Sequence, residues 1–155
     1  MSEYAVYALG LLFCLSVRAE TIPAGWKIVK DSKDACQIAV PAEWSPFGEN
    51  NGAAMLRDAT TAIAVVTSQP GQEFKPLTPG LIKAIGIPKE KLFENTATRI
   101  FYQDRTSRNS EETNAFSSSV PAKSGTCSCH VVVLPSVTED TAKKIALSLS
   151  RVPES

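Results

Sequence analysis

The sequence has 155 residues, of which 43% are hydrophobic and 21% are charged, which is the composition and size of one globular domain. Lysine plus arginine and aspartate plus glutamate each number 16, so the chain has no net charge with which to attract nucleic acid or an anionic membrane. We therefore expect no nucleic-acid partner.

The N-terminal segment 1–19 has the features of a secretory signal peptide. Its apolar run over 5–17 is followed by Val-Arg-Ala ending at Ala19, which places small residues at the −3 and −1 positions of a peptidase site. Glu3 precedes the run without a lysine or arginine, and the run is too short to span a bilayer comfortably. We predict a signal peptide over 1–19, one domain over 20–155, a periplasmic or secreted location, and no stable membrane insertion after cleavage.

The first half of the mature chain has the pattern of β-strands. Trp26–Lys30 and Cys36–Val40 are β-branched or alternating runs on either side of a polar turn, which predicts a hairpin. In the second run every other residue, starting with the cysteine, falls on one face. The turn signal Asn51-Gly52 introduces a strand over Ala53–Arg57. The segment 61–68 is apolar at nearly every inner position, which is typical of a strand covered on both faces.

A short helix is predicted after these strands. Thr78-Pro79 is typical of a helix start, with a capping hydroxyl followed by proline at the first helical position. Leu81, Ile82 and Ile85 follow at helical spacing, so we expect them to form a buried side. Glycine and proline end the helix, and KEKLF after them predicts one further turn.

Strands resume in the second half. Thr96–Arg105 has strand character, with Ile100 and Tyr102 on one face. Thr113–Val120 and Thr126–Leu134 predict a second hairpin across the turn PAKSG. Several serines in the first of these two strands indicate a half-exposed face.

A final amphipathic helix closes the predicted domain. Ser136 and Glu139 match a capping box, with acidic residues at the positive end of the helix dipole. Pro153 is expected to end the helix. Its apolar stripe consists of Ala142, Ile145, Ala146, Leu149 and Val152.

The order of these elements indicates a mixed α+β domain whose antiparallel sheet has helices packed on its faces. With an early strand closing in IAVPAEW (38–44) and a last helix ending in SLSRVP (148–153), the chain resembles the Mog/PsbP-like group. That resemblance implies an α/β/α sandwich in which a mostly antiparallel sheet is flanked by helices.

The resemblance also implies a kind of function. Members of the group are generally binding or assembly modules: one branch binds a small GTPase in the nucleus, another supports the photosynthetic oxygen-evolving complex, and many bacterial relatives are exported. This chain is similar to the last kind, which implies an exported, non-catalytic protein that needs no cofactor and binds an unknown protein or small ligand. No functional motif of the group is present, so no residue role is carried over.

The three cysteines of the mature chain would meet an oxidising compartment after export, where disulfides persist. Cys127 and Cys129 share one strand face with Cα atoms about 6.7 Å apart, at the far limit for a direct bridge. A bridge from Cys36 to either of them would close a loop of 91 or 93 residues and stabilise the fold by up to about 4–5 kcal/mol. All three are therefore disulfide candidates, and the pairing stays open.

The same cysteines carry the main alternative, a thiol-redox or soft-metal-handling protein. Thiolates of Cys36, Cys127 and Cys129 would suit zinc or copper(I). His130 points to the opposite strand face, so it does not converge with them. The Cys-x-Cys pair also has no nearby cation or helix N-terminus to lower a thiol pKa.

The sequence contains residues for two further kinds of site, a hydrolase site and an aromatic groove. Ser128 and His130 share a strand face, but two residues along a strand is too far for a nucleophile and its base, and there is no GxSxG motif. We therefore expect no enzyme. Four aromatic residues are candidates for lining a ligand groove, although buried aromatics are more often core: Trp26, Trp44, Phe47 and Tyr102.

Overall fold

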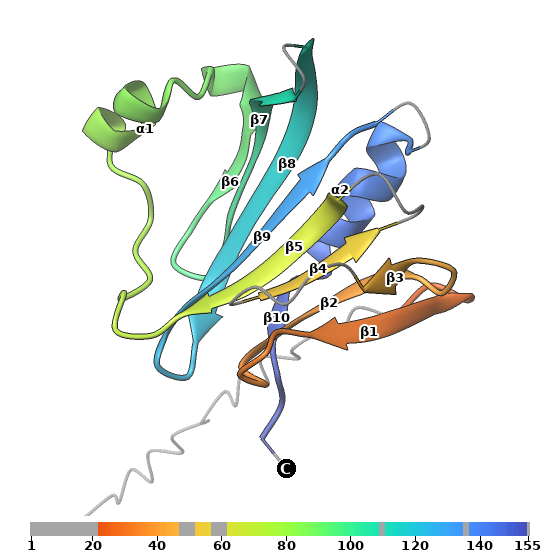
Figure 1. Ribbon diagram of the computed structural model, residues 1–155. Helices are drawn as coiled ribbons and strands as arrows, with labels where there is room; N and C mark the ends of the chain where they lie inside the picture. Colours follow the sequence, from red (N-terminus) through yellow and green to blue (C-terminus); the bar gives the residue numbers. More distant parts are fainter. Residues whose placement is uncertain (1–21, 47–51, 57–61, 109–110, 135–136, 155) are drawn as a thin grey trace, which may run out of the picture.

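The computed structural model describes residues 22–46, 52–56, 62–108, 111–134 and 137–154. The predicted signal peptide, Phe47, Asn51 and Ser136 lie outside these residues. Within them the strands form two antiparallel sheets, a small one and a large one (Figure 1). The strands of the small sheet are β1 (Trp26–Lys30), β2 (Cys36–Pro41) and β10 (Ser150–Arg151), with β2 in the middle.

The large sheet is continuous from β3 at one edge to β6 at the other. Its strands, in the order in which they lie side by side, are β3 (Ser45–Pro46), β4 (Gly52–Leu56), β5 (Ala62–Gln69), β9 (Gly125–Val132), β8 (Glu111–Ala122), β7 (Ile100–Arg108) and β6 (Leu92–Asn95).

One face of the large sheet carries the hydrophobic core. The helix α2 (Glu139–Leu147) packs on β8 and β9, and β2 packs beside it on β5 and β9. In Figure 1, α2 lies behind the sheet. Core side chains of β2, β8, β9 and α2 meet between these layers, with Trp44 and Phe116 among the largest fully buried ones.

The predicted α+β domain with an α/β/α sandwich is wrong. The described chain is mostly antiparallel β-sheet, and α2 is the helix that packs on the large sheet, on one face. The other helix, α1 (Pro79–Ile85), lies beside the sheet in Figure 1. The physical reason lies in β8 and β9, where buried residues alternate with half-buried polar ones, so the sheet has only one strongly apolar face to cover.

The predicted ends of α1 are confirmed, but the prediction that one side of this helix is buried is wrong. The Thr78 side chain accepts a hydrogen bond from the Leu81 N–H, and Gly86 ends the helix in the left-handed conformation. No residue of α1 is buried, however, and Leu81 and Ile85 are 46% and 42% exposed. The helix has about two turns, and no other described element packs closely against it. A 3₁₀ turn, η1 (Lys89–Lys91), follows where one further turn was predicted.

The hairpin β6–β7 was only half predicted. Leu92–Asn95 form β6, and the turn from Thr96 to Arg99 returns the chain antiparallel as β7. The Thr96 hydroxyl accepts hydrogen bonds from the N–H groups of Thr98 and Arg99, so its side chain builds the turn. The predicted strand start at Thr96 was therefore wrong, because threonine also favours such turns.

The two hairpins predicted from the sequence, β1–β2 and β8–β9, are confirmed. β1 and β2 pair from Trp26 opposite Pro41 to Lys30 opposite Gln37. β8 and β9 pair up to Ala122 opposite Gly125, which leaves a two-residue turn. Alternation therefore assigned the faces of these strands correctly.

The last helix is shorter than predicted and has a different cap. Thr138, not Ser136, accepts the hydrogen bond from the Thr141 N–H. The helix ends at Leu147, because the Ser148 hydroxyl bonds back to the Ile145 carbonyl and also accepts from the Ala39 N–H of β2 at 2.8 Å. The chain then pairs with β2 as β10 instead of continuing as helix to Pro153. Four of the five residues of the predicted apolar stripe are buried, and the fifth, Val152, is half-buried.

Candidate functional site

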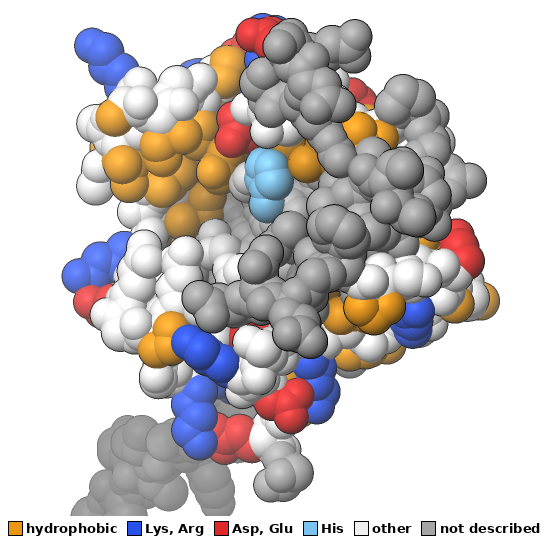
Figure 2. All heavy atoms as spheres, viewed as in Figure 1, with side chains coloured by type: hydrophobic (Ala, Val, Ile, Leu, Met, Phe, Trp, Pro, Cys, Tyr) orange, Lys and Arg blue, Asp and Glu red, His pale blue; other side chains and the backbone are white. Residues whose placement is uncertain are grey.

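Polar side chains occupy the face of the large sheet that is turned away from α2. On β9, Cys127, Cys129 and Val131 point into the core, so Ser128 and His130 point to the opposite face. In Figure 2 the pale blue imidazole of the chain's single histidine lies in a hollow of this face. The predicted separation of His130 from the two cysteines is confirmed.

The register of the strands places hydroxyl groups beside Ser128. Ser128 is paired with Thr67 of β5 on one side and with Ser119 of β8 on the other. The hydroxyl oxygens of Ser119 and Ser128 are 3.3 Å apart, within hydrogen-bonding distance. This row therefore has three hydroxyl side chains on three adjacent strands.

The next row contains the imidazole. Ser117 of β8 lies between His130 of β9 and Tyr102 of β7. Its hydroxyl oxygen is 3.0 Å from His130 Nδ1, close enough for a hydrogen bond whose direction depends on the imidazole tautomer. Ser117, Tyr102 and His130 therefore form one cross-strand polar cluster.

The two rows line a small cavity of about 190 Å³. The side chains of the two rows are half-buried, so they are shielded from bulk water without being part of the core. Ser118 and Cys129, which are buried, complete the wall of the cavity. The half-buried polar side chains that line it are Thr67, Tyr102, Ser117, Ser119, Ser128 and His130.

The electrostatics of the cavity keep its ionisable groups neutral near neutral pH. Burial lowers the pKa of His130, and the charge of Asp104 opposes this shift only in part. Burial also raises the pKa of Tyr102, and a hydrogen bond with Ser117 offsets part of that rise. The imidazole therefore offers one donor and one acceptor, and the phenol keeps its proton.

The contact between Ser117 and His130 has the distance that a nucleophile and its base need. Acyl transfer also needs hydrogen-bond donors that stabilise an oxyanion, and backbone N–H groups are a common form of such donors. The β8 backbone around Ser117 pairs with β7 on one side and with β9 on the other, so its N–H groups are engaged in the sheet. Among the described residues, the site therefore supplies hydrogen-bonding side chains, and the β8 backbone around Ser117 offers no free N–H group to an oxyanion.

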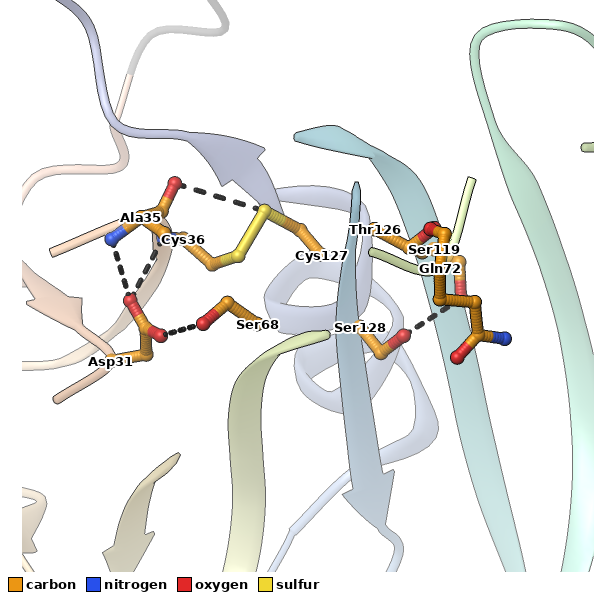
Figure 3. The surroundings of a disulfide bond; sticks show 9 residues. All are labelled: Asp31, Ala35, Cys36, Ser68, Gln72, Ser119, Thr126, Cys127 and Ser128. Carbon is orange, nitrogen blue, oxygen red and sulfur yellow. Dashed lines mark hydrogen bonds between the residues drawn. A yellow bond between two sulfur atoms is a disulfide. The ribbon is translucent and has the colours of Figure 1, made fainter. Parts of the chain in front are cut away.

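A disulfide lies on the opposite side of β9. Cys36 of β2 is bonded to Cys127 of β9, with Cα atoms 5.5 Å apart, and the bridge joins the small sheet to the large one (Figure 3). The prediction that Cys36 forms a bridge is confirmed, and its partner is Cys127. Beside the bridge, the Asp31 carboxylate accepts hydrogen bonds from the Ser68 hydroxyl at 2.6 Å and from the Cys36 N–H at 2.9 Å.

The residues of the predicted soft-metal or redox site are arranged differently from a thiolate cluster. Cys36 and Cys127 are bonded to each other, and Cys129 is a buried free thiol whose pKa burial raises to about 12. Within the described ranges, no group of three histidine, cysteine, aspartate or glutamate side chains is placed to hold a metal ion.

The predicted groove aromatics do not come together. Trp44 is 1% exposed inside the core, and Trp26 packs against that core. Tyr102 lines the cavity on the other face of the large sheet, and Phe47 lies outside the described residues.

Sequence reasoning missed Ser117, Ser119 and Thr67. It compared His130 with Ser128, its neighbour along the chain, although the closest side chains in a sheet lie across the strands. The pairing depends on the turn: two residues between β8 and β9 place Ser117 opposite His130, whereas the predicted five-residue turn PAKSG would place Phe116 there. Thr67 could not be placed in this way, since its pairing with Ser128 joins strands far apart in the sequence.

No family model matches the chain, and no curated protein sequence matches it either. Neither α1 nor α2 is long and apolar enough to cross a membrane.

Proposed function

We propose that the protein is an exported, non-catalytic binding module that takes a small ligand in the cavity around His130. The observation that carries this proposal is the convergence of six polar side chains from four strands on the face that α2 leaves uncovered. A recessed cavity with convergent polar groups is the usual form of a ligand site. The modest volume, about 190 Å³, favours a small ligand over the surface of a protein partner.

Export is supported by the disulfide and by the predicted signal peptide. Disulfides persist in the periplasm and outside the cell, and they are rare in reducing compartments. We expect the intact mass of the protein from the producing cell's envelope or medium to correspond to a chain that starts at Glu20 and contains one disulfide. A cytoplasmic protein that retains residues 1–19 would contradict export.

Binding without catalysis is supported by the backbone around Ser117. An activated serine would react with a fluorophosphonate probe, and Ser117 is the serine whose hydroxyl lies beside an imidazole in the described structure. We expect no labelling of the wild-type protein. Labelling that disappears in Ser117→Ala would contradict the non-catalytic proposal.

The binding proposal is tested by nuclear magnetic resonance on the single histidine. His130 gives one imidazole signal in untagged protein, because the chain has no other histidine. We expect a dialysable small-molecule extract of the envelope to shift this signal in the wild type and in Ser124→Ala, which changes an exposed serine in the β8–β9 turn. The shift should weaken in Ser117→Ala. An extract that leaves the His130 signal unchanged in the folded wild type would contradict the proposal.

The resemblance to the Mog/PsbP-like group stays a prediction. It agrees in kind with a binding module. The proposal rests on the cavity, and no residue role is taken from that group.

A further inference from the structure

We infer that the cavity around His130 takes an uncharged, hydroxyl-rich ligand with the chemistry of a single sugar residue. This inference rests on the proposed function, because it concerns the same cavity. It is carried by the charge, the hydrogen-bonding capacity and the size of the site.

The charge of the cavity disfavours ionic ligands. The six lining side chains are five hydroxyls and an imidazole, and no lysine or arginine is among them. Asp104, two residues after Tyr102 on β7, acts electrostatically on both Tyr102 and His130. An anionic ligand would therefore meet a carboxylate of like charge and find no cation among the described residues of the lining. A cationic ligand would have to rely on Asp104 alone.

The hydrogen-bonding capacity selects the chemistry of the ligand. Each lining hydroxyl can both donate and accept, and a neutral imidazole has one donor and one acceptor. The contacts between Ser117 and His130 and between Ser119 and Ser128 use part of this capacity and leave both kinds of group free. A carboxylate only accepts and an ammonium only donates, so either would use only one of the two hydrogen-bonding capacities of each lining hydroxyl. Ligand hydroxyls donate and accept, as the cavity does.

The size of the cavity fits one ring of a saccharide. A volume of about 190 Å³ equals the space of roughly six water molecules at about 30 Å³ each. Tyr102 adds an amphipathic aromatic side chain to the lining, with an apolar ring and a polar tip. We therefore expect a saccharide to place one residue in the cavity and to leave the rest of its chain outside.

The test is a titration of untagged protein at neutral pH, followed by the His130 imidazole signal and the backbone amide signals. The panel consists of neutral monosaccharides and disaccharides, citrate as the anion, and spermidine as the cation. We expect at least one neutral saccharide to shift the His130 signal saturably, and citrate and spermidine to leave it unchanged. Ser117→Ala and Ser128→Ala should each weaken that binding by about 3- to 10-fold, the usual effect of losing one hydrogen bond.

Ser124→Ala is the matched control, because it removes an exposed hydroxyl outside the cavity and should keep wild-type affinity. The amide spectrum of each variant verifies that it is folded. Where one serine variant fails to fold, the other tests the same cavity.

The outcomes separate the ligand class from the binding proposal. Citrate or spermidine that shifts His130 while saccharides do not would overturn the ligand class and leave the binding module standing. If no compound of the panel shifts the His130 signal while the envelope extract still does, the ligand class is likewise overturned and the binding module stands. If neither the panel nor the extract shifts the His130 signal, both proposals are overturned. A saccharide that binds without moving His130 would overturn the assignment of the site.

Discussion

Asp31 is a buried carboxylate that holds the turn between β1 and β2. Its oxygens accept hydrogen bonds from the Ser68 hydroxyl and from the N–H groups of Ala35 and Cys36. Burial by itself would raise the pKa of Asp31, but these hydrogen bonds outweigh it, and the pKa is lowered. The side chain therefore ties β2 to β5 beside the disulfide, and it does so in the charged form.

We expect the Asp31 carboxylate to make the free energy of unfolding decrease at acid pH. Its folded-state pKa lies below the ordinary value of 3.8, so its contribution is fully present above that pH and is lost as the pH falls through the folded-state pKa. Asp31→Asn should lower the free energy of unfolding at neutral pH by about 1–3 kcal/mol and flatten the pH dependence below about pH 4. Urea unfolding at several pH values measures both effects.

Asp34→Asn is the control for that experiment, because it changes an exposed carboxylate in the same turn. Asp34 has a positive φ, which asparagine tolerates, and it forms an exposed ion pair with Lys30 at 3.4 Å. Loss of this ion pair should change the free energy of unfolding by less than about 1 kcal/mol. Equal effects of the two substitutions would contradict the role assigned to Asp31.

Cys129 should behave as an inert thiol in the folded protein. It is buried, and burial raises its pKa to about 12, so very little thiolate exists at neutral pH. We expect iodoacetamide to modify Cys129 only after denaturation, as read from the intact mass, and Cys36, Cys127 and Cys129 all to react after reduction and denaturation. Rapid modification of the native protein, or copurified zinc or copper, would favour the thiol or metal alternative.

At the scale of elements, the β1–β2 and β8–β9 hairpins were predictable, and the exposure of α1 was not. Strands β1, β2, β8 and β9 have alternating patterns bounded by turn residues, which are local signals. The apolar spacing of Leu81 and Ile85 is also a helical signal, but burial depends on whether another layer lies against the helix. Packing of that kind involves residues far apart in sequence, so a local pattern cannot determine it.

The β8–β9 hairpin depends on one glycine. Gly125 has a φ of +114°, and a Cβ at this position would lie 2.1 Å from the Gln69 carbonyl oxygen. Gly125→Ala should therefore strain the turn and push β9 away from the end of β5. We expect a loss of about 2–4 kcal/mol in the free energy of unfolding, measured in urea.

Gly71→Ala separates backbone strain from the close approach. Gly71 also has a positive φ, at +79°, but nothing lies within 4 Å of its hypothetical Cβ. This control should cost only about 1–2 kcal/mol, the penalty of the left-handed conformation for alanine. If Gly125→Ala cost no more than the control, the contact with Gln69 would have no energetic importance.

At the scale of the whole molecule, the sequence predicted one domain with strands and a terminal helix but placed the helices wrongly. The position of a helix layer depends on which face of the sheet is apolar. Identifying that face requires the register of β7, β8 and β9 together. The disulfide partner of Cys36 was likewise undetermined, since Cys127 and Cys129 share a strand face. Only the packing of β2 against β9 brings Cys127, not Cys129, to within 5.5 Å of Cys36 between Cα atoms.

One face of β9 carries the disulfide and the other lines the cavity for which ligand binding is proposed, and a disulfide variant can separate the two roles. The bridge joins residues 91 positions apart, so removing it in the double variant Cys36→Ala and Cys127→Ala should cost up to about 4–5 kcal/mol in the chain-entropy model. His130 and Ser128 point to the opposite face and take no part in the bridge. The folded double variant should thus unfold at a lower urea concentration, yet bind with near wild-type affinity a saccharide that the wild type binds. Cys129→Ala, which keeps the bridge, is the control for removing a buried thiol. If ligand affinity fell together with stability while the variant was still folded, the two faces would be coupled and this division of roles would be wrong.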